Sequence, residues 1–329
     1  IYNRYKLIMT TYKEIRGTNI EAVASDPSNP VEGQVWYNTT SNTVKANYIN
    51  PGTWSTGGAL NTGRESVTGI GSQAAAIVAG GVIDGAAVTE LYNGTNWTEI
   101  NDLNTARVRL SSGGTTTSAL VFAGRSPTSG PSGVALTEAF DDTSWTEVAD
   151  LNTARENGGG AGASRTNGLF FGGDPVVAIT ELYNGTSWSE VNNMNNARGT
   201  FNGCGTNTAA LAVAGKEVPS SGNKTELWNG TNWTELNNLS GASRYGTGVA
   251  GITTSALVFG GFGPTENRKL TESWNGSSWT AVTAMSQGRA MPAGAGTSNT
   301  AALATGGGSP TASTEEWDAG PTTVTFDVS

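Results

Sequence analysis

The chain has 329 residues, a formal net charge of −9, 46 glycines, one cysteine and no histidine. Without histidine there is no Ser–His–Asp triad, no histidine general base and no histidine-ligated metal site, and a single cysteine excludes an internal disulfide. An acidic chain with scattered basic residues is not expected to bind nucleic acid, and no apolar run approaches the ~20 residues of a membrane span. The composition therefore favours a protein that is not an enzyme, holds no metal or cofactor and does not insert into a membrane.

The first 50 residues lack the repeated features of the rest of the chain. Pro27, Pro30 and Pro51 interrupt this segment at intervals that suit an extended arm. Residues 35–45, with the sequence VWYNTTSNTVK, are typical of two short strands joined by a turn. We expect residues 1–50 to form an extended N-terminal arm outside the main domain.

The rest of the chain is a repeat. Tryptophan recurs six times at a spacing of 43 to 48 residues, an arginine follows each tryptophan about ten residues later, and a Thr–Glu pair comes before the next turn. Three independent markers thus occur six times each. The tryptophans are Trp54, Trp97, Trp145, Trp188, Trp233 and Trp279, the arginines are Arg64, Arg107, Arg155, Arg198, Arg244 and Arg289, and the glutamates are Glu90, Glu138, Glu181, Glu226, Glu272 and Glu315.

Each repeat predicts four short antiparallel strands, named a, b, c and d here. A Gly-rich stretch is followed by a short apolar run, a variable segment, an aromatic position and the tryptophan segment, and Asn-Gly dipeptides mark tight hairpins between c and d. Six such units predict an all-β fold, a six-bladed β-propeller over residues 51–320. The first unit has only strand d and the last only a to c, so the strand at 54–58 should close the last blade. Residues 321–329 are expected to form a C-terminal strand or tail.

These repeats resemble the Kelch family. Its marks are a Gly-Gly after strand b, found at 80, 172, 260 and 306, an aromatic residue in strand c, and a tryptophan in strand d. The aromatic-to-tryptophan spacing of five is about one residue shorter than is expected for Kelch, and two units have Ala-Gly instead of Gly-Gly. The resemblance implies a Kelch-like propeller and says nothing of function.

The N-terminal segment resembles the start of structural proteins of tailed bacteriophages, notably marine and cyanobacterial phages. The resemblance rests on residues 10–17 (TTYKEIRG), Asp26-Pro27 and residues 30–42 (PVEGQVWYNTTSN). It implies a virion protein made in the host cytoplasm, a tail fibre or other surface-exposed adhesin. Its arm would join other virion proteins, and the propeller would bind a host surface glycan or protein as part of a homo-oligomer. Met9 stands where such proteins begin, so residues 1–8 are expected to be extra sequence.

Residues that recur once per blade are expected to serve each blade rather than one active site. We expect the repeated glutamates to pair with backbone N–H groups or the repeated arginines, and the repeated aromatics to pack between blades. Binding is expected where blades differ, in the b-to-c segments, which share one face with the d-to-a loops. The candidate ligand-binding residues are Arg125, Asp174, Lys216 and Arg268; catalytic and metal-binding residues are not expected.

Three other functions are compatible with the sequence. The first is a capsid- or neck-attached decoration protein without a receptor role, and the second is a cellular scaffold for protein interactions. The third is a carbohydrate-active enzyme on the propeller, which needs a pair of carboxyl groups in a groove. The non-repeated acids that such an enzyme could use, Asp84, Asp174, Glu217 and Glu266, show no pairing in the sequence.

Overall fold

The structure, a computed structural model, describes residues 20–28, 30–31, 33–81, 87–127, 132–217, 222–263, 269–308 and 311–326. Within these ranges all the regular structure is β, in 26 strands. The predicted all-β class is therefore confirmed. The chain divides into two compact units, residues 1–50 with 320–329, called the N-terminal unit here, and residues 51–319, called the repeat unit.

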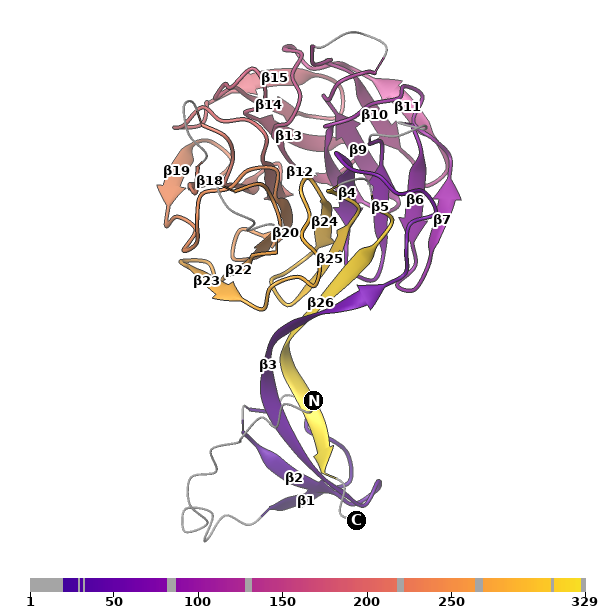
Figure 1. Cartoon of the computed structure of the whole chain (residues 1–329), viewed down its shortest axis with the longest axis vertical. Helices are drawn as coiled ribbons and strands as arrows, with labels where there is room; N and C mark the ends of the chain where they lie inside the picture. Colours follow the sequence, from indigo (N-terminus) through magenta and orange to yellow (C-terminus); the bar gives the residue numbers. More distant parts are fainter. Residues whose placement is uncertain are drawn as a thin grey trace. The chain divides into compact units, whose positions relative to one another are not determined.

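The repeat unit is built from four-stranded antiparallel sheets arranged around a common axis (Figure 1). In each sheet the first strand lies near the axis and the fourth at the rim, so the fold is propeller-like (Figure 1). The first three sheets are β4 (Thr68–Gly71), β5 (Ala76–Ala79), β6 (Thr89–Tyr92) and β7 (Trp97–Ile100); β8 (Ser111–Thr115), β9 (Ser118–Phe122), β10 (Thr137–Phe140) and β11 (Trp145–Val148); and β12 (Gly159–Ser164), β13 (Asn167–Phe171), β14 (Thr180–Tyr183) and β15 (Trp188–Val191).

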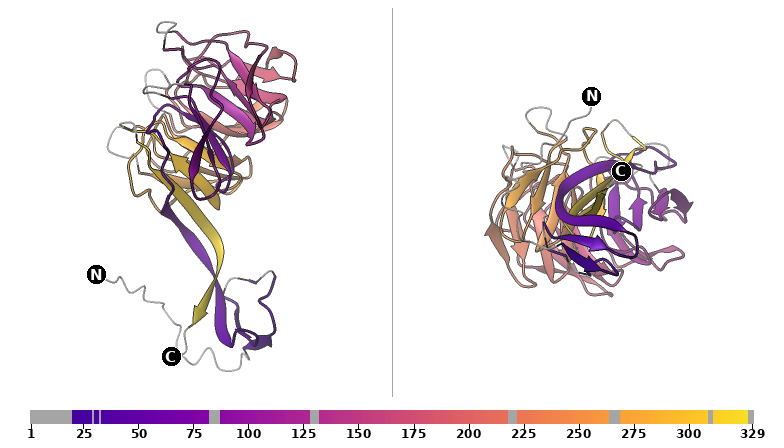
Figure 2. Two further views of the ribbon diagram at one scale, coloured as in Figure 1. Left: turned by 90° about the vertical axis from the view of Figure 1, so that its right-hand side faces the viewer. Right: turned by 90° about the horizontal axis from the view of Figure 1, so that it is seen from below.

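Two further sheets follow the same order, and one sheet differs. The regular ones are β16 (Asn202–Thr206), β17 (Ala209–Val213), β18 (Thr225–Trp228) and β19 (Trp233–Leu236); and β20 (Gly248–Ile252), β21 (Ser255–Phe259), β22 (Thr271–Trp274) and β23 (Trp279–Val282). The other sheet has six strands in the order β1-β2-β3-β26-β25-β24. Its strands are β1 (Glu21–Val23), β2 (Val35–Asn38), β3 (Thr43–Gly57), β24 (Ala293–Gly296), β25 (Ala301–Thr305) and β26 (Thr314–Phe326). Strands β3 and β26, from opposite ends of the sequence, run beside one another (Figure 2).

The core lies between neighbouring sheets. The second strand of each sheet is apolar on both faces because sheets pack against both of its sides, as for residues 118–122 with the sequence SALVF. Leu120 and Phe122 of one sheet, for example, share a buried cluster with Phe170 and Trp188 of the next. The short apolar runs that the sequence marked as strand b therefore form the packing layers.

Five of the six rim tryptophans also connect neighbouring sheets through a polar contact, whereas the indole N–H of Trp145 has no hydrogen-bond partner among the described residues. The indole N–H of Trp188 donates to the hydroxyl of Thr137 in the preceding sheet over 3.1 Å, and Trp54 of β3 donates in the same way to Thr271 over 3.0 Å. The Trp54 ring also packs 5.4 Å from the Trp317 ring between their centroids. The equivalent bonds in other sheets join Trp97 to Thr314, Trp233 to Thr180 and Trp279 to Thr225.

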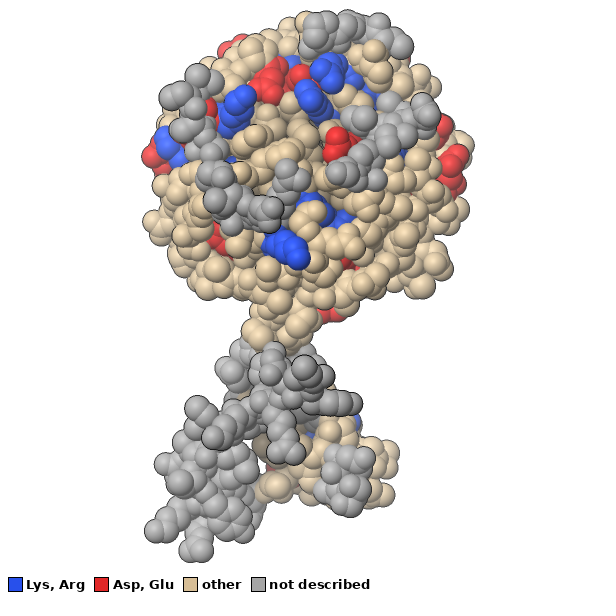
Figure 3. All heavy atoms as spheres, in the orientation of Figure 1, with Lys and Arg blue, Asp and Glu red and all other residues tan. Residues whose placement is uncertain are grey.

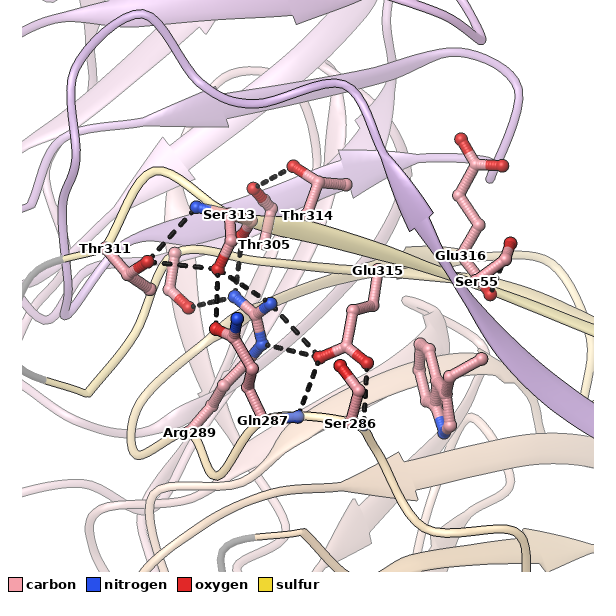
Figure 4. A network of polar contacts seen from close by, with 12 residues as sticks. Ser55, Ser286, Gln287, Arg289, Thr305, Thr311, Ser313, Thr314, Glu315 and Glu316 are labelled. Atoms are coloured by element: carbon pink, nitrogen blue, oxygen red, sulfur yellow. Dashed lines mark hydrogen bonds and ion pairs between the residues drawn. The ribbon is translucent and has the colours of Figure 1, made fainter. Parts of the chain in front are cut away.

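A buried ion pair recurs in every sheet. The six repeated arginines each contact the repeated glutamate of the same unit at 2.7 to 3.1 Å, and both side chains are almost completely buried. In the pair shown in Figure 4, Arg289 also donates to the carbonyl oxygens of Gly306 and Ser313, while Glu315 accepts the backbone N–H of Ser286. Burial lowers the pKa of each arginine, and the facing glutamate opposes that shift. The predicted structural role of these residues is confirmed.

The N-terminal unit is more organised than the extended arm that its prolines predicted. Strand β2 pairs antiparallel with β3, which confirms the predicted hairpin, and β1 adds to β2 in parallel. The reason lies in one residue distant in sequence: Asp26 accepts hydrogen bonds from the buried Trp36 indole over 2.9 Å and from Asn38 over 2.7 Å, and pairs with Lys45 at 2.7 Å. These bonds, the one from Lys45 foremost, lower the pKa of Asp26 to about 2.

Candidate functional site

Six residues at the start of the inner strands form a hydrogen-bonded circle around the axis, called the axial circle here. Each stands two positions after a repeated arginine and has a positive φ, from 51° to 61°. Their backbones connect one sheet to the next: Arg109 N donates to Ser66 O over 2.9 Å, and the series continues around the axis until Ser66 N donates to Met291 O over 3.3 Å. At one step the N–H that donates, to Asn157 O, belongs to Phe201, the residue that follows Thr200 of the circle. The members are Ser66, Arg109, Asn157, Thr200, Gly246 and Met291.

The axial circle lies at one end of a central channel. A cavity of about 30 Å³, lined by all six residues of the circle, occupies this end. A larger cavity of about 160 Å³ at the other end is lined mainly by glycines of the inner strands. Glycine is required there because the strands approach backbone to backbone: a Cβ on Gly160 would lie 2.6 Å from the carbonyl oxygen of Ser112, and one on Gly294 would lie 2.4 Å from that of Val249.

Three of the four candidate binding residues are described, and they occupy equivalent positions. Arg125, Asp174 and Lys216 each come directly after the Gly-Gly or Ala-Gly that ends strand b. Each forms an isolated β-bridge with the residue that follows a repeated arginine, next to the axial circle: Arg125 with Val108, Asp174 with Glu156, and Lys216 with Gly199. Arg268 lies outside the described residues, as do Asp84 and Glu266.

A charged network connects two of these residues to the axial circle. Glu156, which is buried, contacts Arg109 of the circle at 3.3 Å and lies 3.7 Å from Nε of Arg125. The side chains of Arg109 and Arg125 remain about one-third exposed, at 32% and 30%. One carboxylate thus faces two arginines from a neighbouring sheet. Figure 3 shows basic and acidic side chains close together on one face of the repeat unit.

Asp174 is held by the circle itself. Its Oδ2 accepts a hydrogen bond from Asn157 over 2.9 Å and one from the Thr200 hydroxyl over 3.1 Å. Because Asp174 and Glu156 are also bridged through their backbones, the structure brings Arg125 and Asp174 into one polar sector. Lys216 is exposed on the next sheet.

Sequence reasoning missed the centre of this sector. Arg109, Glu156, Asn157 and Thr200 were not chosen because they lie next to a repeated arginine, in a part of the unit that was treated as scaffold. A signal was present nevertheless: the residue two positions after the arginine differs in all six units, whereas the residue directly before the arginine is Gly, Ala or Ser in all six. Such variation within a repeat indicates positions that the fold does not determine.

The same position in another unit carries an aromatic pair. Tyr245, directly after the repeated Arg244, stacks on Phe262 with ring centroids 5.2 Å apart and an interplanar angle of 24°. Both side chains are partly buried. The face around the axis is therefore polar and charged at one sector and aromatic at another.

Other reactive groups are few in the described part of the chain. No group of three Cys, Asp or Glu side chains that could hold a metal ion occurs there. Burial raises the pKa of the Cys204 thiol to about 12, so this group stays protonated at neutral pH and is a poor nucleophile. No described helix is long and apolar enough to cross a membrane.

Comparison with known proteins adds no relative by sequence. No protein-family model matches the chain, and no curated protein matches it.

Proposed function

We propose that this chain is a virion structural protein of a tailed bacteriophage, a tail fibre or another surface-exposed adhesin, without enzymatic activity. The repeat unit is a six-bladed Kelch-like propeller whose last blade is closed by the β3 strand. It binds a host surface glycan or protein through the face that holds the axial circle. The protein acts in the virion as a homo-oligomer.

Six blades and closure of the last blade by β3 are supported by the contacts between neighbouring sheets, which are also made where β3 and β25 meet the sheets beside them. Trp54 of β3 donates to Thr271 as four of the other five rim tryptophans donate to the threonine of a neighbouring sheet. A buried cluster likewise combines Val78 and Tyr92 of the first sheet with Leu303 of β25. If β3 were not the fourth strand of the last blade, it would not be expected to make the contacts that recur between the other neighbouring sheets.

The observation that carries the binding role is the polar sector on an otherwise repetitive scaffold. The repeated glutamates are engaged by buried arginines and backbone N–H groups, which leaves them unsuited to acid–base chemistry. In contrast, Arg109 and Arg125 are not part of the repeated pattern, and their side chains remain about one-third exposed beside the buried Glu156. Variable polar residues on a rigid ring of sheets are typical of a binding surface.

The N-terminal unit is proposed to join other virion proteins. It has its own buried centre, Trp36, and its own polar bonds through Asp26. Among the described residues, four of the five exposed large apolar side chains belong to it: Ile20, Val31, Val35 and Phe326. Exposed apolar groups concentrated on a small unit favour contact with another protein.

Cell binding by the full chain tests the adhesin role. Labelled protein is incubated with a panel of bacterial strains, cyanobacteria included, and compared with a variant in which Arg125, Lys216 and Arg268 become Glu and Asp174 becomes Lys. We expect binding to at least one strain and its loss in the variant, with the circular dichroism spectrum unchanged. The control variant Arg165→Glu alters an exposed arginine in the turn between β12 and β13, at the other end of the inner strands. Binding that survives in the fourfold variant would mean that the propeller is a spacer or a decoration.

Immunogold electron microscopy of phage particles tests the location. An antibody against the repeat unit should label tail fibres or another surface-exposed structure. Labelling spread over the capsid would favour the decoration protein instead. Particles assembled with a chain that lacks residues 1–48 should carry no label.

A further inference from the structure

We propose that the polar sector of the axial circle binds an oxyanion group of the ligand, a carboxylate or a sulfate, between Arg109 and Arg125. This inference rests on the proposed binding role of the same face and adds the chemical class of the ligand. The chain as a whole carries a net charge of −9. This net charge does not favour an anion site, so such a site requires basic side chains gathered in one place.

The first step is that donors exceed acceptors in this sector. Two guanidinium groups face the single carboxylate of Glu156, one at 3.3 Å and the other at 3.7 Å, which is beyond hydrogen-bond distance. The Nε atom of Arg109 is buried and has no hydrogen-bond partner among the described residues, and the same holds for Oε2 of Glu156. Each guanidinium carries five N–H donors, so most of this capacity is unused by the described residues.

The second step is that the other carboxylate nearby does not compete for these arginines. Asp174 Oδ2 already accepts hydrogen bonds from Asn157 and Thr200, and no ion pair connects Asp174 to a described basic residue. These bonds also orient the Asn157 amide and the Thr200 hydroxyl toward Asp174 and away from a ligand. Beside the Glu156 carboxylate, whose Oε2 has no hydrogen-bond partner among the described residues, the two arginines thus keep unused donors, and a guanidinium is cationic at any physiological pH.

The third step concerns size and access. The cavity at the circle, about 30 Å³, corresponds to the volume of about one water molecule in the liquid. It is too small for a sugar ring, so a ligand has to present its charged group at the mouth of the cavity. Arg109 lines this cavity, and both arginines are about one-third exposed, so a substituent that points from a larger ligand can reach them. The planar fork of a guanidinium matches the paired oxygens of a carboxylate or a sulfate.

The experiment compares matched ligands on the full chain by isothermal titration calorimetry. The probes are an oligogalacturonate, the same oligomer with its carboxyl groups methyl-esterified, a sulfated galactose oligosaccharide and its unsulfated form. We expect the charged member of at least one pair to bind about tenfold more tightly or better, as one charge-assisted contact of moderate strength would give. The pair that shows the difference identifies the carboxylate or the sulfate as the group that is bound.

Three variants assign the effect to the sector. Replacement of both arginines, Arg109→Gln with Arg125→Gln, should abolish the difference between charged and uncharged probes. Glu156→Gln should tighten binding of the charged probe, because the variant removes the carboxylate that competes for the same donors. Arg165→Gln, at the other end of the inner strands, is the matched control and should change nothing. Thermal melting of each variant shows whether it is folded, and the opposite signs expected for the arginine and glutamate variants cannot both arise from loss of structure.

Equal binding of charged and uncharged probes, no binding of any probe, or an unchanged preference in the double arginine variant would overturn the proposal. None of these results decides whether the protein is an adhesin, because cell binding by the fourfold variant tests that role independently. If the fourfold loop variant still loses binding to cells, the face is a receptor site for an uncharged group. If cell binding survives in that variant, the proposed function itself fails.

Discussion

The buried ion pair of the third sheet offers a direct test of what holds the sheets together. Arg155 contacts Glu181 at 2.9 Å, and neither side chain is exposed. Arg155 also donates to the carbonyl oxygens of Gly172 and Ile179. The change Arg155→Ala removes the charge that compensates Glu181 and leaves two carbonyl oxygens without this donor. Breaking a buried pair costs about 3–5 kcal/mol, and each orphaned acceptor about 1–3 kcal/mol, although such losses overlap. We expect a loss of about 5 kcal/mol in the free energy of unfolding.

The assay is urea unfolding followed by tryptophan fluorescence, with thermal melting as a second measure. A loss of about 5 kcal/mol corresponds to a fall in Tm of roughly 10 °C for a domain of this size. The control is Arg165→Ala, since Arg165 lies 4.0 Å from Asp141 with both side chains nearly half exposed, and such a surface pair contributes about 1 kcal/mol or less. Arg155→Lys keeps the charge but not the forked donor and should fall between the two. If Arg155→Ala is no more damaging than Arg165→Ala, the recurrent pairs do not stabilise the sheets and the reasoning is refuted.

Three further predictions concern other parts of the chain. Trp54→Ala should lower the free energy of unfolding by about 3 kcal/mol, since the ring packs between two other aromatics and its N–H is bonded; an unchanged unfolding curve would remove the support for closure by β3. Asn93→Asp should change stability by no more than about 0.5 kcal/mol, because Asp141 accepts the same two backbone N–H bonds at the equivalent turn; a larger loss in thermal melting would contradict this. Asp26 has its pKa lowered from 3.8 to about 2, so its contribution to stability is complete above about pH 4 and is lost as the pH falls toward 2; Trp36 fluorescence should report this loss, and Asp26→Asn should remove the pH dependence.

The repeat made the scaffold predictable from the sequence. The marker tryptophan, arginine and glutamate of the repeat each occur in six copies, so a role inferred for one copy could be checked against five others. The Arg–Glu pair was expected for that reason. The N-terminal segment offered no such check. Its prolines indicated an extended arm, whereas the structure depends on Asp26, which reaches Trp36, Asn38 and Lys45 across 10 to 19 residues. Contacts of this kind leave no periodic trace in a single sequence.

The candidate site was predictable only in part. Arg125 and Asp174 were found because they begin loops of unequal length, but Glu156, which lies between them and Arg109, was missed. Glu156 comes directly before Asn157, one of the turn residues with positive φ, and variation at these turns does not show which side chains meet one another. Which side chains meet around an axis depends on how the sheets are placed, and this is a property of the whole ring.

The axial circle is made of backbone atoms, and this has a consequence for how the protein can change. Serine, arginine, asparagine, threonine, glycine and methionine all occupy the circle while its hydrogen bonds continue from sheet to sheet. A new side chain there alters what the end of the channel presents without removing the backbone bonds of the circle, although at Arg109 and Thr200 it also removes a side-chain bond to a neighbouring sheet. The left-handed backbone sets the main cost, of order 1 kcal/mol or more for a bulky residue, yet Thr200 shows that even a β-branched residue is held. The circle therefore provides six positions at which selection, or a protein engineer, can change the side chain shown at the end of the channel in single substitutions while its backbone bonds stay in place.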